Sequence, residues 1–265
     1  MIEVSIGCAV RRGALAGAVA GGVGAVVMYV LVEPSIRAAI AIEDARHEAS
    51  HTGLGKASHH GGEIVTRGQQ VYAGMLTAVV VGVLVGIAFA LVNRHLGDRI
   101  AGTAAGPAAP VVVAALGFVS FTLAPAVVLP ANPPSIGDPS TVGVRTMVYL
   151  GTIVCAVALT SVVVALSRAR SLSPRNRVLA PALAAVGAVI VVTLATPNVA
   201  DQVPGDVPAS LLWEFRLGSL AQMGAMWFVM GAGYAWLSAA PDRGPTRRRA
   251  ARRGPAASSS ARSGA

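Results

Sequence analysis

Hydrophobic residues in this sequence are grouped in long uninterrupted runs and do not alternate regularly with polar ones. Six runs stand out, at approximately residues 13–32, 71–93, 108–129, 143–166, 178–196 and 209–237. A hydrocarbon core about 30 Å thick is crossed by roughly 20 helical residues, so each run is long enough to span a membrane. Backbone amides cannot bond to water there, which makes each run a predicted helix. We therefore expect an all-α polytopic membrane protein with six transmembrane helices.

The composition excludes two other classes of protein. Hydrophobic residues make up 54% of the chain and charged residues only 12%, whereas a soluble domain carries about a quarter charged residues. This balance argues against a soluble enzyme. The only cysteines are Cys8 and Cys155, so the chain is not a disulfide scaffold.

The distribution of charge predicts the orientation in the membrane. Lysine and arginine concentrate in alternate connections, as the positive-inside rule requires of cytoplasmic loops. The basic residues of that set are Arg11, Arg12, Arg94, Arg99, Arg168, Arg170, Arg175, Arg177 and the arginines between 243 and 262. Both termini are therefore predicted to be cytoplasmic. The expected division is a cytoplasmic N-terminus at 1–12, a bundle at 13–240 with an external loop at 33–70, and a disordered basic cytoplasmic tail at 241–265.

Glycines recur every four residues on two of the predicted helices, at Gly13, Gly17 and Gly21 and at Gly82 and Gly86. Small residues at this spacing let two helix backbones approach closely, which is how membrane helices associate without a hydrophobic driving force. We expect these stripes to be packing surfaces.

The first external loop is the strongest candidate for metal binding, because it holds His47, His51, His59 and His60. Residues 35–51 are predicted to form a helix, which places Glu43, His47 and His51 on one stripe with Glu48 beside it. Two imidazoles four residues apart can chelate one ion, and the flexible His59-His60 pair could complete the shell. Imidazole and carboxylate suit Zn, Co, Ni or Cu, and the affinity order does not select cobalt. The alternative is an exposed polar loop with incidental histidines, or a pH sensor.

The segment His47-Glu48-Ala49-Ser50-His51 also matches H-E-x-x-H, the signature of zinc peptidases, with Glu48 as the base. The match is short, and a peptidase also needs a third ligand and a formed cleft. Proteolysis is therefore the weaker hypothesis.

Polar residues inside predicted spans are the next candidates, because charge in a membrane is costly. They are Arg145, Glu214, Arg216 and Gln222. Arg216 could pair with Glu214, Asp138 or Asp206, or snorkel outward. The predicted role is either a structural lock between helices or a part of a permeation path. Three methionines, at 223, 226 and 230, share a face of the last helix, and packing is favoured over ion transfer for them.

Nucleotide binding has no support in the sequence. The stretch 53–58, Gly-Leu-Gly-Lys-Ala-Ser, lacks the order of a phosphate-binding loop. Active transport would thus need an ion gradient or a separate subunit.

Several segments together resemble the CbtA family of probable cobalt transporter subunits. They are Val32-Glu33-Pro34 with the acidic, histidine-bearing loop, the Gly-rich segment 72–91 with Phe89-Ala90-Leu91, and the proline segment 129–139 with Arg145-Thr146 and Tyr149-Leu150. The most specific is 207–222, VPASLLWEFRLGSLAQ, followed by Trp227. The family is usually described with five spans, one fewer than predicted here.

The resemblance implies cobalamin-linked cobalt uptake beside a small single-span, His-rich partner. It assigns metal gathering to His47, His51, His59 and His60, and structural or pathway roles to Arg145 and Arg216. We thus expect a non-enzymatic subunit of a divalent-metal uptake system in a bacterial-type inner membrane, with transported Co²⁺ and no tightly bound cofactor, nucleotide or nucleic acid. The alternatives are a membrane scaffold or regulator of a metal transporter, and the H-E-x-x-H metallopeptidase.

Overall fold

The computed structural model describes residues 5–51, 66–101, 106–134, 136–169, 171–173, 175–195 and 203–239. These residues form helices and their connections and contain no strand, so the all-α prediction is confirmed. In chain order the elements are α1 (Ile6–Val27), the π-helical turn η1 (Met28–Val32), α2 (Glu33–His51), α3 (Arg67–Ala101), α4 (Ala109–Phe118), the π-helical turn η3 (Val119–Leu123), α5 (Ala124–Val128), the 3₁₀ turn η4 (Pro139–Thr141), α6 (Val142–Arg168), α7 (Asn176–Ala195) and α8 (Ala209–Ala239). The predicted tail at 241–265 lies outside the described residues.

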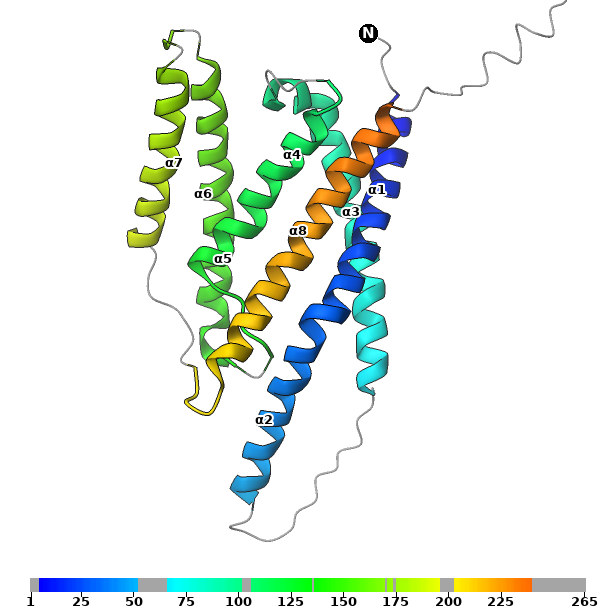
Figure 1. The fold of residues 1–265 in the computed structure, drawn as a ribbon, viewed down its shortest axis with the longest axis vertical. Coiled ribbons are helices and arrows are strands. Elements are labelled where there is room, and N and C mark those ends of the chain that lie inside the picture. Colours follow the sequence, from blue (N-terminus) through cyan, green and yellow to red (C-terminus); the bar gives the residue numbers. More distant parts are fainter. Residues whose placement is uncertain are drawn as a thin grey trace, which may run out of the picture.

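The helices run up and down the long axis of the molecule, and the start of α1 and the end of α8 lie at the same end (Figure 1). Four helical stretches of the described chain are long and apolar enough to cross a membrane: Ile6–Ala49, Arg67–Ala101, Ala109–Val128 and Pro139–Arg168. The first four predicted spans coincide with these stretches to within one residue at their ends or fall inside them. Crossing by α7 and α8, and the cytoplasmic location of the termini, stay predictions.

The first helix does not end at the predicted boundary of its span. Residues 35–51 were predicted as a helix of their own, but α1, η1 and α2 form one continuous helix that runs through Pro34. Proline has no N–H to donate to the preceding turn, and a π-helical turn, which bonds residues five apart, accommodates this locally. The Glu33 N–H accordingly donates to the Met28 carbonyl. The helix therefore continues beyond its neighbours and carries α2 away from the bundle (Figure 1).

The same local device recurs in the helix formed by α4, η3 and α5. The π-helical turn η3 ends two residues before Pro125, and the Ala124 N–H donates to the Val119 carbonyl. Both prolines thus follow a π turn at the same offset, and each helix continues instead of breaking.

The predicted glycine stripes form the contact between α1 and α3. A Cβ added to Gly17 would collide with the Gly82 carbonyl, and one added to Gly13 or Gly21 would lie 2.5 Å from the Ala90 Cβ or the Ala78 carbonyl oxygen. The two backbones are therefore in direct contact along the stripe. The packing role expected of these glycines is confirmed.

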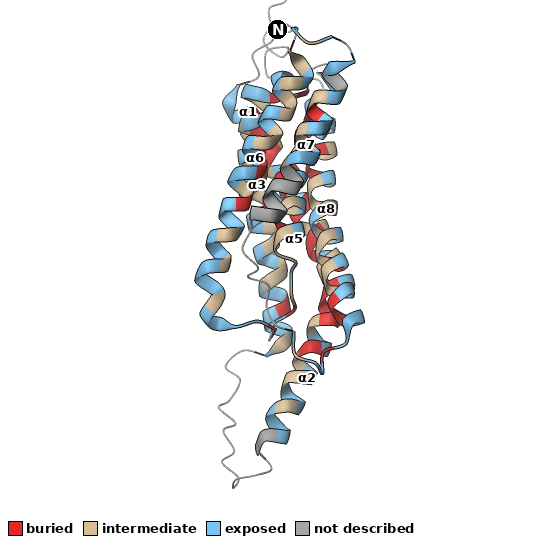
Figure 2. Cartoon of the chain, turned by 90° about the vertical axis from the view of Figure 1, so that its left-hand side faces the viewer, coloured by how far each residue is buried: buried red, intermediate tan, exposed pale blue. Residues whose placement is uncertain are grey.

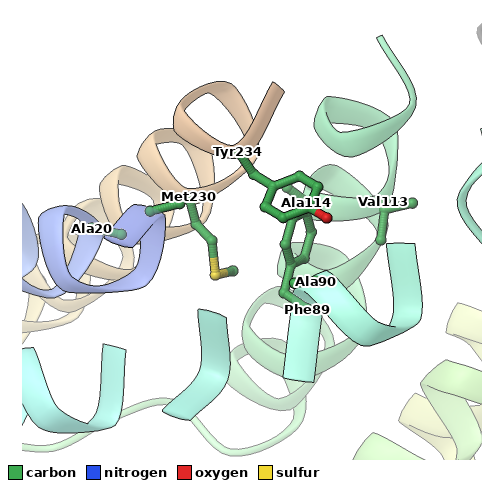
Figure 3. Close-up of a cluster of buried hydrophobic side chains, with 8 residues drawn as sticks. Ala20, Phe89, Ala90, Val113, Ala114, Met230 and Tyr234 are labelled. Atoms are coloured by element: carbon green, nitrogen blue, oxygen red, sulfur yellow. The ribbon is translucent and has the colours of Figure 1, made fainter. Parts of the chain in front are cut away.

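Helix α8 packs across α1 and α4 and completes the core. Met230 and Tyr234 of α8 are buried among small residues of α1 and α4 and against Phe89 of α3 (Figure 3). The Phe89 and Tyr234 rings meet edge to face, with centroids 5.6 Å apart. Met226 lies against Gly24, so the methionine stripe packs in the core at two of its three positions, as favoured from the sequence.

The burial pattern is that of a protein surrounded by lipid. The buried residues are dominated by alanine and glycine, while large apolar side chains such as Tyr72, Leu183 and Trp236 are at least 70% exposed. Figure 2 shows exposed and intermediate residues over the outer surfaces of the helices and buried ones facing inward. Because lipid is as apolar as leucine, close approach of small residues, and not burial of large ones, holds the helices together.

Helices α6 and α7 form a pair beside this core. They pack on each other, and α6 meets the other helices mainly through α5, η3 and η4, whereas α3 packs chiefly on α1 and α4. The space between α3 and α6 is therefore left partly unfilled by protein.

Candidate functional site

The end of α2 that projects from the bundle carries the part of the predicted metal site that the structure describes (Figure 1). Glu43 and His47 lie one turn apart, with His47 Nε2 3.9 Å from Glu43 Oε1. The His47 side chain is 67% exposed and that of Glu43 39%. An imidazole and a carboxylate thus share one exposed face of the helix, as a divalent ion requires of two neighbouring ligands.

The other predicted ligands are not brought into this pair by the described residues. Glu48 is exposed on α2, one residue beyond His47 and so turned away from the Glu43 stripe. His51 is the last residue of α2, but its side chain, like His59 and His60, lies outside what the structure describes. Within the described residues no group of three or more His, Cys, Asp or Glu could hold an ion. The full metal site stays a prediction.

A buried carboxylate lies at the base of α2, and the sequence analysis missed its role. Glu33 is 4% exposed. Its Oε1 accepts hydrogen bonds from Arg37 Nε at 2.9 Å and from Arg67 Nε at 3.1 Å, and its Oε2 accepts one from Arg67 Nη2 at 2.6 Å. The spacing of Glu33 and Arg37 could have suggested the first contact, but nothing local points to Arg67. The cluster fastens the start of α2 to the start of α3.

A second ion pair holds α2 nearer its C-terminal end, at Arg46. Arg46 Nη2 donates to Asp206 Oδ1 at 2.9 Å and Arg46 Nε donates to Oδ2, which ties α2 to the segment leading into α8. The hydrogen bonds from Arg46 lower the pKa of the Asp206 carboxyl below its ordinary value. Glu33 lies ten residues before Glu43, and Arg46 lies between Glu43 and His47. The two ion pairs therefore fix the base of α2 and the turn that carries the candidate ligands.

Among the described residues, Arg216 bonds to the proline segment and to none of the three acids considered for it. Its Nη2 donates to Asn132 Oδ1 at 2.9 Å and its Nε to the Ala131 carbonyl at 3.1 Å, while Asp206 is taken by Arg46. A planar guanidinium suits this two-point contact. Arg216 therefore fastens the proline segment onto α8. A role of Arg216 in a permeation path stays a prediction.

The remaining charged residues of the predicted set lie near the same end. Glu214 is exposed on α8, and Arg145 is half-buried in the first turns of α6. Asp138 caps η4, accepting a hydrogen bond from the Ser140 N–H at 2.8 Å. Hydrogen bonds from Ser140 lower the pKa of the Asp138 carboxyl.

A cavity of about 400 Å³ opens beside Arg216, between α8, the proline segment and α6. Its polar lining includes Tyr149, Ser219 and Gln222 in addition to Arg216. Gln222, predicted as a polar residue within a span, thus faces a cavity. Neutral oxygen donors at this depth can replace part of the hydration shell of a cation.

These observations define a class of protein: a polytopic helical membrane protein with a charged, histidine-bearing helix projecting from one end. The model of the CbtA family, described as a probable cobalt transporter subunit, matches residues 8–239. The chain belongs to this family. No curated protein and no solved structure matches it.

Proposed function

We propose that the chain is the integral-membrane subunit of a cobalt uptake system and captures Co²⁺ at the outer end of α2. His47 and Glu43 supply the first ligands, and His51, His59 and His60 complete the shell. The ion then passes toward the cavity lined by Ser219 and Gln222. A small single-span, His-rich partner and a location in a bacterial-type inner membrane belong to this proposal.

The observation that carries the proposal is the pairing of His47 with Glu43 on an exposed helix in a chain of a cobalt transporter family. Imidazole with carboxylate is a donor set for Co²⁺ and its neighbours in the transition series. Two ion-pair clusters hold the helix on which the pair lies, so its position relative to α3 and α8 is fixed. A helix held in this way presents ligands with little loss of entropy on binding.

Radiolabelled cobalt uptake tests the proposal in a cobalt-starved host that lacks its own importers. Wild type is compared with the variant His47, His51, His59 and His60→Ala, each with and without the His-rich partner. We expect uptake to need the chain and to fall about tenfold or more in the variant at limiting cobalt. His95→Ala is the matched control, because His95 lies near the end of α3, away from α2, where its Nδ1 is 2.8 Å from the Leu91 carbonyl.

The outcomes separate the candidate functions. Wild-type uptake by the four-histidine variant at limiting cobalt would overturn the capture step. No uptake under any combination would favour the scaffold or regulator hypothesis.

A second comparison separates capture from proteolysis. Glu43 shares a helical stripe with His47, whereas Glu48 lies on another face of α2. Glu43→Gln should therefore weaken Co²⁺ binding by the purified protein about tenfold and Glu48→Gln by much less. In a peptidase Glu48 would matter more than Glu43, because Glu48→Gln would abolish peptide cleavage while the metal stays bound.

A further inference from the structure

A cavity of about 770 Å³ lies in the space between α3 and α6, closed at the back by α4, η3 and α8. Its walls are aliphatic over most of their length, with Val85, Val92 and Leu96 from α3 and Val157 and Val164 from α6. The principal contacts of α6 are with α7, α5, η3 and η4. The groove thus separates the α6–α7 pair from the main bundle.

The hydroxyl groups in the groove are already bonded within the protein. Ser120 Oγ and Thr160 Oγ1 share a hydrogen bond of 2.9 Å, and Ser161 Oγ donates to the Val157 carbonyl. Thr122 Oγ1 accepts from Trp227 Nε1 at 3.2 Å. Each of these hydroxyls thus has a hydrogen-bond partner within the protein. Because the rest of the lining is aliphatic, the groove suits an occupant that is apolar along most of its length.

Two arginines provide the exception, and both lie where their helices end. Arg99 of α3 and Arg168 of α6 line the same cavity. Among the described residues neither guanidinium has a hydrogen-bond or ion-pair partner. Asp98, the nearest acid in sequence, accepts a hydrogen bond from the Gly106 N–H at 3.3 Å. The groove therefore combines an apolar body with a doubly cationic end.

The length of the groove fits one leaflet. Val157 and Arg168 are separated along α6 by about 16 Å at roughly 1.5 Å per residue. Half of a hydrocarbon core is about 15 Å. If the aliphatic walls lie at the depth of the acyl chains, the two arginines therefore lie at the depth where the lipid headgroups begin.

We propose that an anionic phospholipid occupies this groove, with its phosphate between Arg99 and Arg168 and an acyl chain along the valines of α3 and α6. Basic pockets between transmembrane helices bind anionic headgroups in this manner. The lipid fills the space that protein leaves open and joins the α6–α7 pair to the main bundle. The site makes no use of the metal ligands on α2, so it stands or falls independently of cobalt capture.

Native mass spectrometry of the purified full-length protein with equal amounts of dioleoyl phosphatidylglycerol and dioleoyl phosphatidylcholine tests the site. We expect wild type to retain phosphatidylglycerol preferentially, and Arg99→Gln/Arg168→Gln to lower that preference roughly 30-fold. The matched control is Arg11→Gln/Arg175→Gln, which removes the same charge from exposed residues that do not line the cavity. The control should stay within about twofold of wild type.

Further arms identify the occupant. Ala88→Trp/Ala165→Trp fills the groove and should expel both lipids while the protein stays monodisperse. Inorganic phosphate should not raise the thermal midpoint of wild type. Three results would each overturn the proposal. The first is equal retention of phosphatidylglycerol by Arg99→Gln/Arg168→Gln and Arg11→Gln/Arg175→Gln, and the second is an arginine-dependent rise of the thermal midpoint with inorganic phosphate. The third is that the tryptophan variant loses a bound protein helix, and not lipid, relative to wild type.

Discussion

Glu33 and Arg67 meet through a two-point contact: Arg67 Nε donates to Oε1 at 3.1 Å and Arg67 Nη2 to Oε2 at 2.6 Å. The Glu33 side chain is 5% exposed and the Arg67 side chain 35%. Parallel bonds of this kind between a guanidinium and a carboxylate are among the stronger polar contacts in proteins. The contact joins the first and second long helices at the point where the first leaves the bundle.

Replacing this carboxylate should destabilise the protein. Glu33→Gln removes the charge that accepts all three arginine hydrogen bonds, and we expect a loss of about 2–3 kcal/mol in the free energy of unfolding. Reversible unfolding in mixed micelles measures it. Asp44→Asn on the exposed side of the same helix is the control and should change little; an equal loss in both variants would contradict a specific role of Glu33.

The glycine contact between α1 and α3 should not tolerate a side chain. Gly17→Leu places atoms where the Gly82 backbone lies, and backbone cannot rotate away, so we expect a loss of about 3 kcal/mol or failure to fold. Gly22→Leu is the matched control, because nothing lies within 4 Å of a Cβ there. Thermal midpoints in detergent should fall for the first variant only. Similar midpoints for the two would show that α1 and α3 are not packed on this stripe.

The guanidinium of Arg216 should be needed to hold the proline segment. Arg216→Lys keeps the charge but loses the planar fork that reaches both Asn132 and Ala131. We expect hydrogen exchange in the segment 129–134 to accelerate about tenfold, corresponding to the loss of one hydrogen bond to a charged group. Glu214→Gln, two residues away and exposed, should leave exchange unchanged. Unaltered exchange in the lysine variant would show that the positive charge of Arg216, and not its two hydrogen bonds, holds the segment.

The pair of Arg46 and Asp206 should weaken only in acid. Its hydrogen bonds lower the pKa of Asp206 in the folded state relative to the unfolded one. The contribution is therefore fully present above the unfolded pKa, roughly pH 4, and is lost as the pH falls through the lower folded pKa. The difference in thermal midpoint between wild type and Asp206→Asn should be constant from pH 7 to about 5 and vanish in stronger acid. A difference that already disappears near pH 6 would implicate a histidine instead.

Local sequence determined the helices and the closest of their contacts. Long apolar runs must satisfy their amides internally, so the helical state of 13–32, 71–93, 108–129 and 143–166 could be anticipated, while the continuation of the first helix through Pro34 could not. The glycine stripes on α1 and α3 were readable for the same reason, since spacing along one helix decides which residues share a face. The pairing of Glu43 with His47 also follows from one helical turn.

The contacts between distant segments were decided only by the tertiary structure. Glu33 meets Arg67 across 34 positions, Arg216 meets Asn132 across 84, and Arg46 meets Asp206 across 160. Which charge finds which partner depends on the crossing and depth of whole helices, and sequence spacing carries no such information. The groove between α3 and α6 could not be read from the sequence either, because a cavity forms where two helices do not pack against each other in the tertiary structure.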